Sequence, residues 1–351
     1  MTGHDENGDA GRPRGRRSTT LKIAGLTLAG LLVLGAGTAG WAYWHLDNNI
    51  KSVDIDNALG DDRPPKAVPT PSADASTEAS PLPAGALNIL VLGSDSRSGK
   101  ENKALGGGSS SGARSDTAMV VHIGAGRTKA TVVSIPRDTL VTRPSCPLTS
   151  GGSTAVAYNS MFNSAYSVGG AVCAVKTVES ITHVRMDHYV EIDFSGFAKL
   201  VNALGGVTVT IDQDIDDHDS HLQLKAGTRL LDGKQALALA RTRHGIGDGS
   251  DLGRIGLQQK LVTALLEQIS STNLFTDPGR LYTVAEAVTS SLTTDTGLDS
   301  LSELVELGRS LKGLSADDVK TVMMPVVTAP SDHNRVVAKE PAASRLWKSL
   351  R

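Results

Sequence analysis

The stretch TAMVVHIGAGRTKATVVSI, residues 117–135, contains two apolar runs rich in β-branched side chains, separated by a short glycine-containing turn. Such runs are typical of β-strands, and so short a connection predicts that residues 117–123 and 129–135 form an antiparallel hairpin. An earlier run, LNILVLG at residues 87–93, predicts another strand. If it also pairs antiparallel with residues 117–123, then Gly93, Thr117 and Ile135 all lie at one edge of a sheet.

Charged residues flank each of these three strand ends. Because separate segments bring them to the same edge, we predict a functional site there rather than a set of solvated loops. Aspartates supply oxygen ligands for Mg²⁺, which commonly binds one or two carboxylates together with phosphate oxygens, and arginines bind phosphate through a planar fork. The pattern therefore favours a magnesium ion and a polyphosphate. The charged residues are Asp95, Arg97, Arg114, Asp116, Arg137 and Asp138.

A second charged cluster lies in ALARTRHGIGDGSDLGRIGLQQ, residues 238–259. It places Arg241, Arg243 and Arg254 close to Asp248 and Asp251, with no lysine among them. Forked, permanently charged arginines indicate an oxyanion that is held bidentately. In contrast, we expect the acid-rich residues 212–222, which include the run DIDDHDSHL, to form a solvated loop.

The overall composition excludes one class of partner. The 351 residues carry a formal net charge of −2, whereas a duplex nucleic-acid binder usually has a strongly basic domain, so we expect no nucleic-acid partner. Apolar residues at three- and four-residue spacing predict helices, and further strands are expected in GGVTVTI and KTVMMP. The expected helices cover residues 172–181, 194–204, 255–269, 281–292 and 298–311.

The N-terminus has the pattern of a membrane anchor. Four arginines between residues 12 and 17 precede an apolar run at residues 21–44, and aspartates follow it. The run is long enough to cross a bilayer as a helix, and arginines mark the cytoplasmic side. We predict a cytoplasmic basic tail at residues 1–20, a single-pass transmembrane helix at residues 21–44 and an extracellular remainder. A cleaved signal peptide is the alternative.

Two further features lie beyond the predicted span. Residues 45–86 are expected to form an extended linker, because their second half is rich in Pro, Ser, Ala and Thr and has few large apolar residues. Cys146 and Cys173 are the two cysteines of the chain, and in an oxidising compartment a disulfide between them is expected.

Seven segments in this order resemble the LytR–CpsA–Psr family of cell-wall glycopolymer transferases. They are NILVLGSDSR, ARSDTAMVVHI, TVVSIPRDT, FNSAYSVGG, DHYVEIDFSGFAKLVNALGGVTV, LDGKQALALARTRHG and DLGRIGLQQ. The resemblance implies an α/β/α sandwich around a central mixed β-sheet, with an apolar pocket for membrane lipid. It implies a catalytic domain at residues 87–330, which leaves residues 331–351 as a short C-terminal tail.

The resemblance also implies a substrate and a reaction. A glycopolymer linked through pyrophosphate to a polyprenol would be transferred to a muramic acid hydroxyl of peptidoglycan, releasing polyprenyl phosphate. Asp95 and Asp116 match the family's magnesium aspartates. The expected catalytic set adds Arg137, Arg241 and Arg243 to these two aspartates. The pyrophosphate-binding positions are Arg97, Arg114, Arg137, Arg241, Arg243, Asp251 and Arg254.

Three points stay open at this level. Asp116 and Asp138 are both candidates for the general base that activates the acceptor. The same residues would also suit a hydrolase that cleaves lipid pyrophosphates with water as the acceptor. A non-enzymatic, membrane-anchored regulator of the cell envelope is the remaining alternative, although about 20 residues before the membrane leave no room for a DNA-binding module.

Overall fold

The computed structural model describes residues 37–66, 85–94, 115–148, 150–242, 251–272 and 277–351. The chain divides into two compact units, residues 1–48 and residues 49–351. In the first unit, residues 37–48 are helical. Most of the predicted membrane span, residues 21–44, lies outside the described residues, and within them no helix combines the length and apolar character needed to cross a bilayer.

The second unit is built on a seven-stranded sheet with the order β1-β12-β7-β2-β3-β4-β13. Strand β2 pairs antiparallel with β3 and parallel with β7, while β4 pairs antiparallel with β3 and parallel with β13. The mixed sheet of an α/β fold, and the antiparallel order of the first three predicted strands, are therefore confirmed. The bounds are β1 Lys51–Val53, β2 Leu87–Ser94, β3 Ser115–Ile123, β4 Ala130–Ile135, β7 His188–Asp193, β12 Leu292–Asp295 and β13 Val319–Met323.

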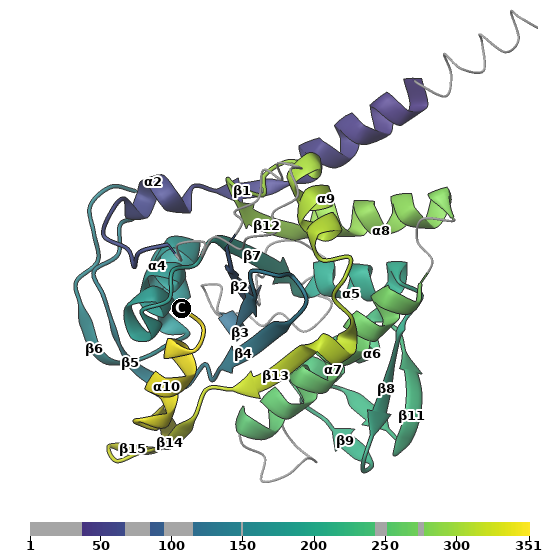
Figure 1. Cartoon of the computed structure of the whole chain (residues 1–351). Coiled ribbons are helices and arrows are strands. Elements are labelled where there is room, and N and C mark those ends of the chain that lie inside the picture. Colours follow the sequence, from purple (N-terminus) through teal and green to yellow (C-terminus); the bar gives the residue numbers. More distant parts are fainter. Residues whose placement is uncertain (1–36, 67–84, 95–114, 149, 243–250, 273–276) are drawn as a thin grey trace, which may run out of the picture. The chain divides into compact units, whose positions relative to one another are not determined.

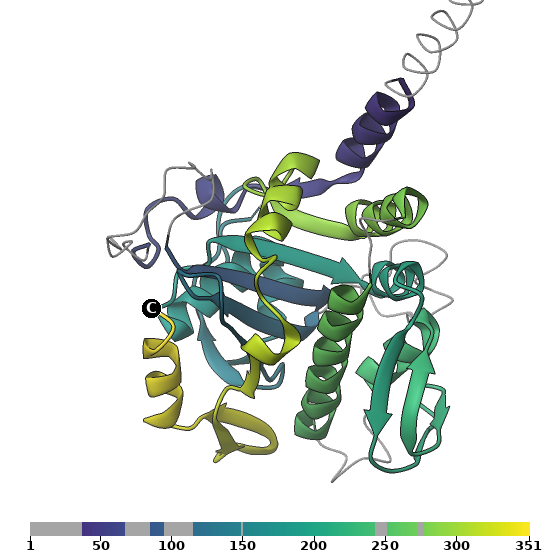
Figure 2. The same cartoon turned by 45° about the vertical axis from the view of Figure 1, so that its right-hand side comes forward.

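Helices cover both faces of this sheet (Figures 1 and 2). On one face, α4 packs Val175 and Val178 against Leu90, Leu92 and Val133 in the largest apolar cluster among the described residues. On the other face lie α5, α6 and α7, and α8 and α9 follow them in the chain. Their bounds are α4 Ser164–Thr182, α5 Phe194–Ala203, α6 Gly233–Arg241, α7 Asp251–Ser271, α8 Pro278–Ser291 and α9 Leu301–Ser310.

Within the described residues, four two-stranded sheets accompany the central sheet. The two strands of each small sheet run antiparallel. They pair β5 Leu140–Arg143 with β6 Ala157–Met161, β8 Val207–Ile211 with β11 Gly227–Leu231, β9 Ile215–Asp217 with β10 Leu222–Leu224, and β14 Val326–Ala329 with β15 Asp332–Ala338.

The prediction that residues 45–86 form an extended linker is wrong for residues 51–66. Strand β1 pairs in parallel with β12, and helix α2, Ile55–Leu59, buries Ile55 and Leu59 against the core under α4. The Asp54 side chain caps α2 by accepting from the backbone N–H of Asn57. One strand of three residues and one helix of five are too short to show apolar periodicity, so the polar composition of the whole stretch hid them.

The description of residues 331–351 as a short tail is also wrong. Strand β15 completes a hairpin with β14 across that boundary, and helix α10, Ala342–Lys348, follows it. Trp347 and Leu350 are 3% and 4% exposed and belong to the same apolar cluster as Val175. In both views the hairpin and α10 lie on the α4 side of the sheet (Figures 1 and 2).

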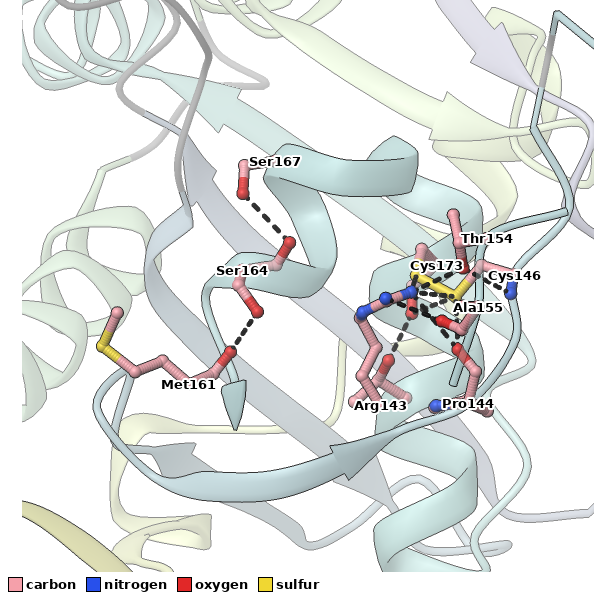
Figure 3. The surroundings of a disulfide bond; sticks show 10 residues. Arg143, Pro144, Cys146, Thr154, Ala155, Met161, Ser164, Ser167 and Cys173 are labelled. Carbon is pink, nitrogen blue, oxygen red and sulfur yellow. Dashed lines mark hydrogen bonds between the residues drawn. A yellow bond between two sulfur atoms is a disulfide. The ribbon is translucent and has the colours of Figure 1, made fainter. Parts of the chain in front are cut away.

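A disulfide joins Cys146, in the loop after β5, to Cys173 on α4 (Figure 3). Both cysteines are fully buried, and the guanidinium of Arg143 lies 3.9 Å from each sulfur. The same guanidinium donates to Thr154 Oγ1 at 2.6 Å and to the carbonyl of Ala155 at 2.8 Å. Closing a loop of 27 residues contributes on the order of 3 kcal/mol to stability, mainly because the bridge restricts the unfolded chain.

Candidate active site

The sheet edge expected from the strand order is present. Ser94 at the end of β2 pairs with Ser115 at the start of β3, and Ile135 at the end of β4 pairs with Ala118. This register brings Asp116 and Arg137 together from segments 21 residues apart, and Arg137 Nη1 donates to Asp116 Oδ1 at 2.5 Å. Their side chains are 26% and 16% exposed, so the pair is partly withdrawn from water and remains reachable by a ligand.

Helix α7 adds a third charge from a distant part of the sequence. Arg254 is 3% exposed, and its Nη2 donates to the main-chain carbonyl of Asp116 at 3.2 Å. One turn later, Gln258 Nε2 donates to Thr117 Oγ1 and to the Ala240 carbonyl, both at 3.0 Å. Residues four apart share one face of a helix, so Arg254 and Gln258 together fix the first turns of α7 against the start of β3.

Helix α6 brings Arg241 to the same place. The helix begins at a capping box formed by Asp232 and Gln235 and ends at Arg241, whose guanidinium lies 4.9 Å from the centre of the Phe194 ring. Gly233 lets α6 approach α5 closely, because a Cβ there would lie 2.0 Å from the Ala198 carbonyl oxygen. A cation at a helix C-terminus is also favoured by the helix dipole.

Asp116, Arg241 and Arg254 line one cavity of about 510 Å³ between the sheet and helices α5, α6 and α7. Most of the remaining lining is apolar and comes from β2, β3 and β7 on one side and from the helices on the other. Val91, Met119 and Val190 contribute from the strands, and Phe197, Leu261 and Val262 contribute from the helices. The cavity therefore combines an apolar interior with charged groups of both signs.

The structure places part of the predicted site. Asp116, Arg137, Arg241 and Arg254 come together, and the first, third and fourth line the cavity. Asp251 begins α7, but its side chain lies outside what the structure describes. The other predicted positions, Asp95, Arg97, Arg114 and Arg243, lie outside the described residues.

The acid-rich run at residues 212–222 contributes where a solvated loop was expected. Asp217 is 1% exposed and accepts from the backbone N–H of Asp219 at 2.9 Å and of Ser220 at 3.3 Å. This turn brings Asp219 and Ser220 to the cavity lining, and Ser220 Oγ lies 3.0 Å from Thr242 Oγ1 at the end of α6. Four of the five aspartates in this run are exposed, and the described part of the chain contains no group of three metal-ligating side chains that could hold an ion.

Gln258 and the turn at Asp217 are site features that sequence reasoning missed. The spacing between Arg254 and Gln258 was a usable signal, because residues four apart on a helix face the same way. The aspartate turn had only a weak local signal, since aspartate favours Asx turns, in which its side chain accepts from the backbone N–H two residues later. Both features belong to the site only because of contacts between distant segments. Gln258 on α7 contacts Thr117 on β3, and Ser220 contacts Thr242.

A sequence model of the LytR_cpsA_psr family matches residues 42–351. The chain is 31% identical over 98% of its length to the probable cell wall biosynthesis protein LcpB of Corynebacterium glutamicum, covering 75% of that protein. It is 30% identical to the polyisoprenyl-teichoic acid–peptidoglycan teichoic acid transferase TagV of Bacillus subtilis, over 67% of this chain and 58% of that one.

The chain spans about half the length of another relative, the cell wall biosynthesis protein LcpA of C. glutamicum, with 30% identity over 70% of this chain and 51% of that one. Among solved structures, B. subtilis TagV superposes with a TM-score of 0.58 at 26% identity, over 77% of this chain and 97% of that chain. The Actinomyces oris LytR-Csp2A-Psr enzyme superposes with a TM-score of 0.58 at 22% identity, over 78% of this chain and 92% of that one, which is a likeness of fold.

Proposed function

Because the chain belongs to the LytR–CpsA–Psr family, we propose that it transfers a cell-wall glycopolymer from a polyprenyl pyrophosphate carrier to peptidoglycan. The observation that carries this proposal is that Arg241, Arg254 and Asp116 line the same cavity as a mostly apolar set of side chains. A polyprenyl chain needs the apolar lining of this cavity, and the pyrophosphate attached to the chain needs fixed cations such as the two arginines. Relatives named as teichoic acid transferases support the same class of reaction.

In the proposed reaction, the acceptor hydroxyl of a muramic acid residue attacks the phosphorus that carries the glycan. The bond from this phosphorus to the bridging oxygen breaks, and polyprenyl phosphate leaves with the negative charge. Arg241 and Arg254 stabilise this developing charge, which is the usual role of arginines in phosphoryl transfer. The proton of the attacking hydroxyl passes to one of the two base candidates, of which Asp116 lines the cavity, whereas Asp138 faces Arg137 and Arg335.

Magnesium is part of the proposal because of the chemistry of the donor set. Asp116 offers a hard carboxylate oxygen beside Arg137, and Mg²⁺ commonly binds one or two carboxylates together with substrate phosphate oxygens. Asp116 and Asp95 would hold the ion. When bound, the ion would neutralise pyrophosphate charge alongside the arginines.

We expect Val262→Trp to impair transfer in a way that depends on lipid length. Val262 is half-buried on α7 and lines the cavity, so an indole there occupies space that the proposed lipid needs. Transfer from a long-chain polyprenyl donor should fall by at least about tenfold, while a donor with a single prenyl unit should be nearly unaffected. The measurement is formation of the glycan–peptidoglycan conjugate by mass spectrometry.

Val305→Trp is the matched control, because Val305 is 42% exposed on α9 and does not line the cavity. Equal losses with long and short donors would count against a lipid in this cavity. Release of polyprenyl phosphate without any conjugate, in the presence of peptidoglycan fragments, would instead assign the protein as a lipid-pyrophosphate hydrolase. A protein that produces neither product would fit the non-enzymatic regulator.

We further propose that the folded unit of residues 49–351 lies outside the cell membrane, with the N-terminus in the cytoplasm. The support is the arginine-rich flank before residues 21–44 and the aspartates after them. A reporter that is active only outside the cytoplasm should therefore be active when it is fused after Arg351. Activity of the matching cytoplasmic reporter at the same position would reverse this orientation.

A further inference from the structure

Four charges of alternating sign run from the C-terminal hairpin to the cavity. Arg335 Nη1 on β15 lies 3.7 Å from Asp138 Oδ1, and Asp138 Oδ2 lies 3.7 Å from Arg137 Nε. Arg137 in turn donates to Asp116, which lines the cavity. The side chains of all four are partly buried, with exposed fractions between 16% and 31%. Ion pairs in such positions are screened less than pairs on an open surface.

Main-chain contacts hold this row of charges in place. Thr139 forms an isolated parallel bridge with Val336, and the Val336 N–H donates to the Asp138 carbonyl at 3.4 Å. On its other side, the turn after β4 is held by the Phe162 N–H, which donates to the Thr139 carbonyl at 2.8 Å. Arg335 therefore reaches Asp138 from a strand that is itself fixed to the turn carrying Arg137.

The geometry assigns Arg335 as a positioning residue that keeps Arg137 available to the anionic part of the donor. Asp138 lies between two guanidinium groups, so its charge is shared between them. Without Arg335, the Asp138 carboxylate would act on Arg137 alone, and the row of four charges would change from neutral to a net charge of −1. Both effects weaken the attraction for a pyrophosphate. The inference rests on the proposed function, because that function supplies the anion.

The test measures binding separately from catalysis. The full-length protein in detergent micelles is titrated with farnesyl pyrophosphate, and the dissociation constant is compared between wild type and Arg335→Ala. We expect binding to weaken about fivefold, the size of a partly buried charge pair. In the transfer assay KM for the donor should rise more than kcat falls. Arg345→Ala, an exposed arginine on α10 in the same C-terminal segment, is the control and should bind as wild type does.

Two further variants separate electrostatics from a structural role. Arg335→Lys keeps the charge and should recover most of the affinity. Asp138→Asn in the Arg335→Ala background removes the carboxylate that competes for Arg137, so this double variant should bind more tightly than Arg335→Ala alone. Binding that stays as weak in the double variant, or a single variant that binds as wild type does, would overturn the inference. A wild-type protein that binds no farnesyl pyrophosphate would overturn the proposed function and this inference together.

Discussion

Arg241→Ala is expected to slow glycopolymer transfer about one hundredfold or more while leaving the fold intact. Arg241 lies at the end of α6 and lines the cavity, with its guanidinium over the Phe194 ring rather than in the apolar core. Its loss removes a favourable interaction with the helix dipole and a cation–π contact, which together contribute about 1–2 kcal/mol. The loss of a preorganised cation at the developing charge is the larger effect. Turnover is measured with a lipid-linked donor, and the melting temperature checks the fold.

Three comparisons make this result specific. Arg241→Lys should recover only part of the rate, because an ammonium keeps the charge but loses the planar fork. Arg309→Ala removes an exposed arginine on α9 and should leave turnover unchanged. Asp116→Asn should lower the rate and shift its dependence on Mg²⁺ concentration. If Arg241→Ala and Asp116→Asn both transfer at the wild-type rate, these cavity charges do not act on the substrate.

Arg63→Ala is expected to lower the free energy of unfolding by about 3–5 kcal/mol. Arg63 and Glu179 form a buried pair with side chains 1% and 3% exposed, and Arg63 Nη2 lies 2.6 Å from Glu179 Oε1. The same nitrogen donates to the Met186 carbonyl at 2.7 Å. Burial by itself lowers the pKa of Arg63, but the carboxylates of Glu179 and Asp56 outweigh it and raise the pKa. Truncating Arg63 therefore leaves the Glu179 carboxylate buried without its cation.

Urea unfolding followed by circular dichroism measures this change. Arg63→Met combined with Glu179→Met removes both charges and should cost much less than Arg63→Ala, because no unpaired ion remains. Arg185→Ala is the control, since Arg185 pairs with Asp56, whose side chain is 64% exposed. An unfolding midpoint for Arg63→Ala equal to that of wild type would show that the Arg63–Glu179 pair does not stabilise the folded unit.

Local patterns in the sequence were sufficient to predict strands β2, β3 and β4 and the edge where the site lies. β-Branched runs and one short turn predicted β3 and β4 as an antiparallel pair, and counting strand ends placed Asp116 beside Arg137. The expected helices also form, although α4 begins eight residues before its predicted start and is kinked at Gly169 and Gly170. These strands and helices depend on residues that are close together in the sequence, so apolar periodicity and turn length are sufficient to predict them.

The remaining features depend on contacts between residues far apart in the sequence. Val262 and Leu265 follow the same apolar spacing as core residues, and only the position of α7 against the sheet makes them cavity lining. Residues 51–66 have the composition of a linker, but in the structure Arg63 pairs with Glu179, which is 116 residues away in the sequence. Residues 331–351 have the composition of a short tail, but in the structure Trp347 lies in the core and Arg335 pairs with Asp138. Burial and charge pairing across such separations arise from packing, which no local pattern encodes, so the tertiary structure alone decided them.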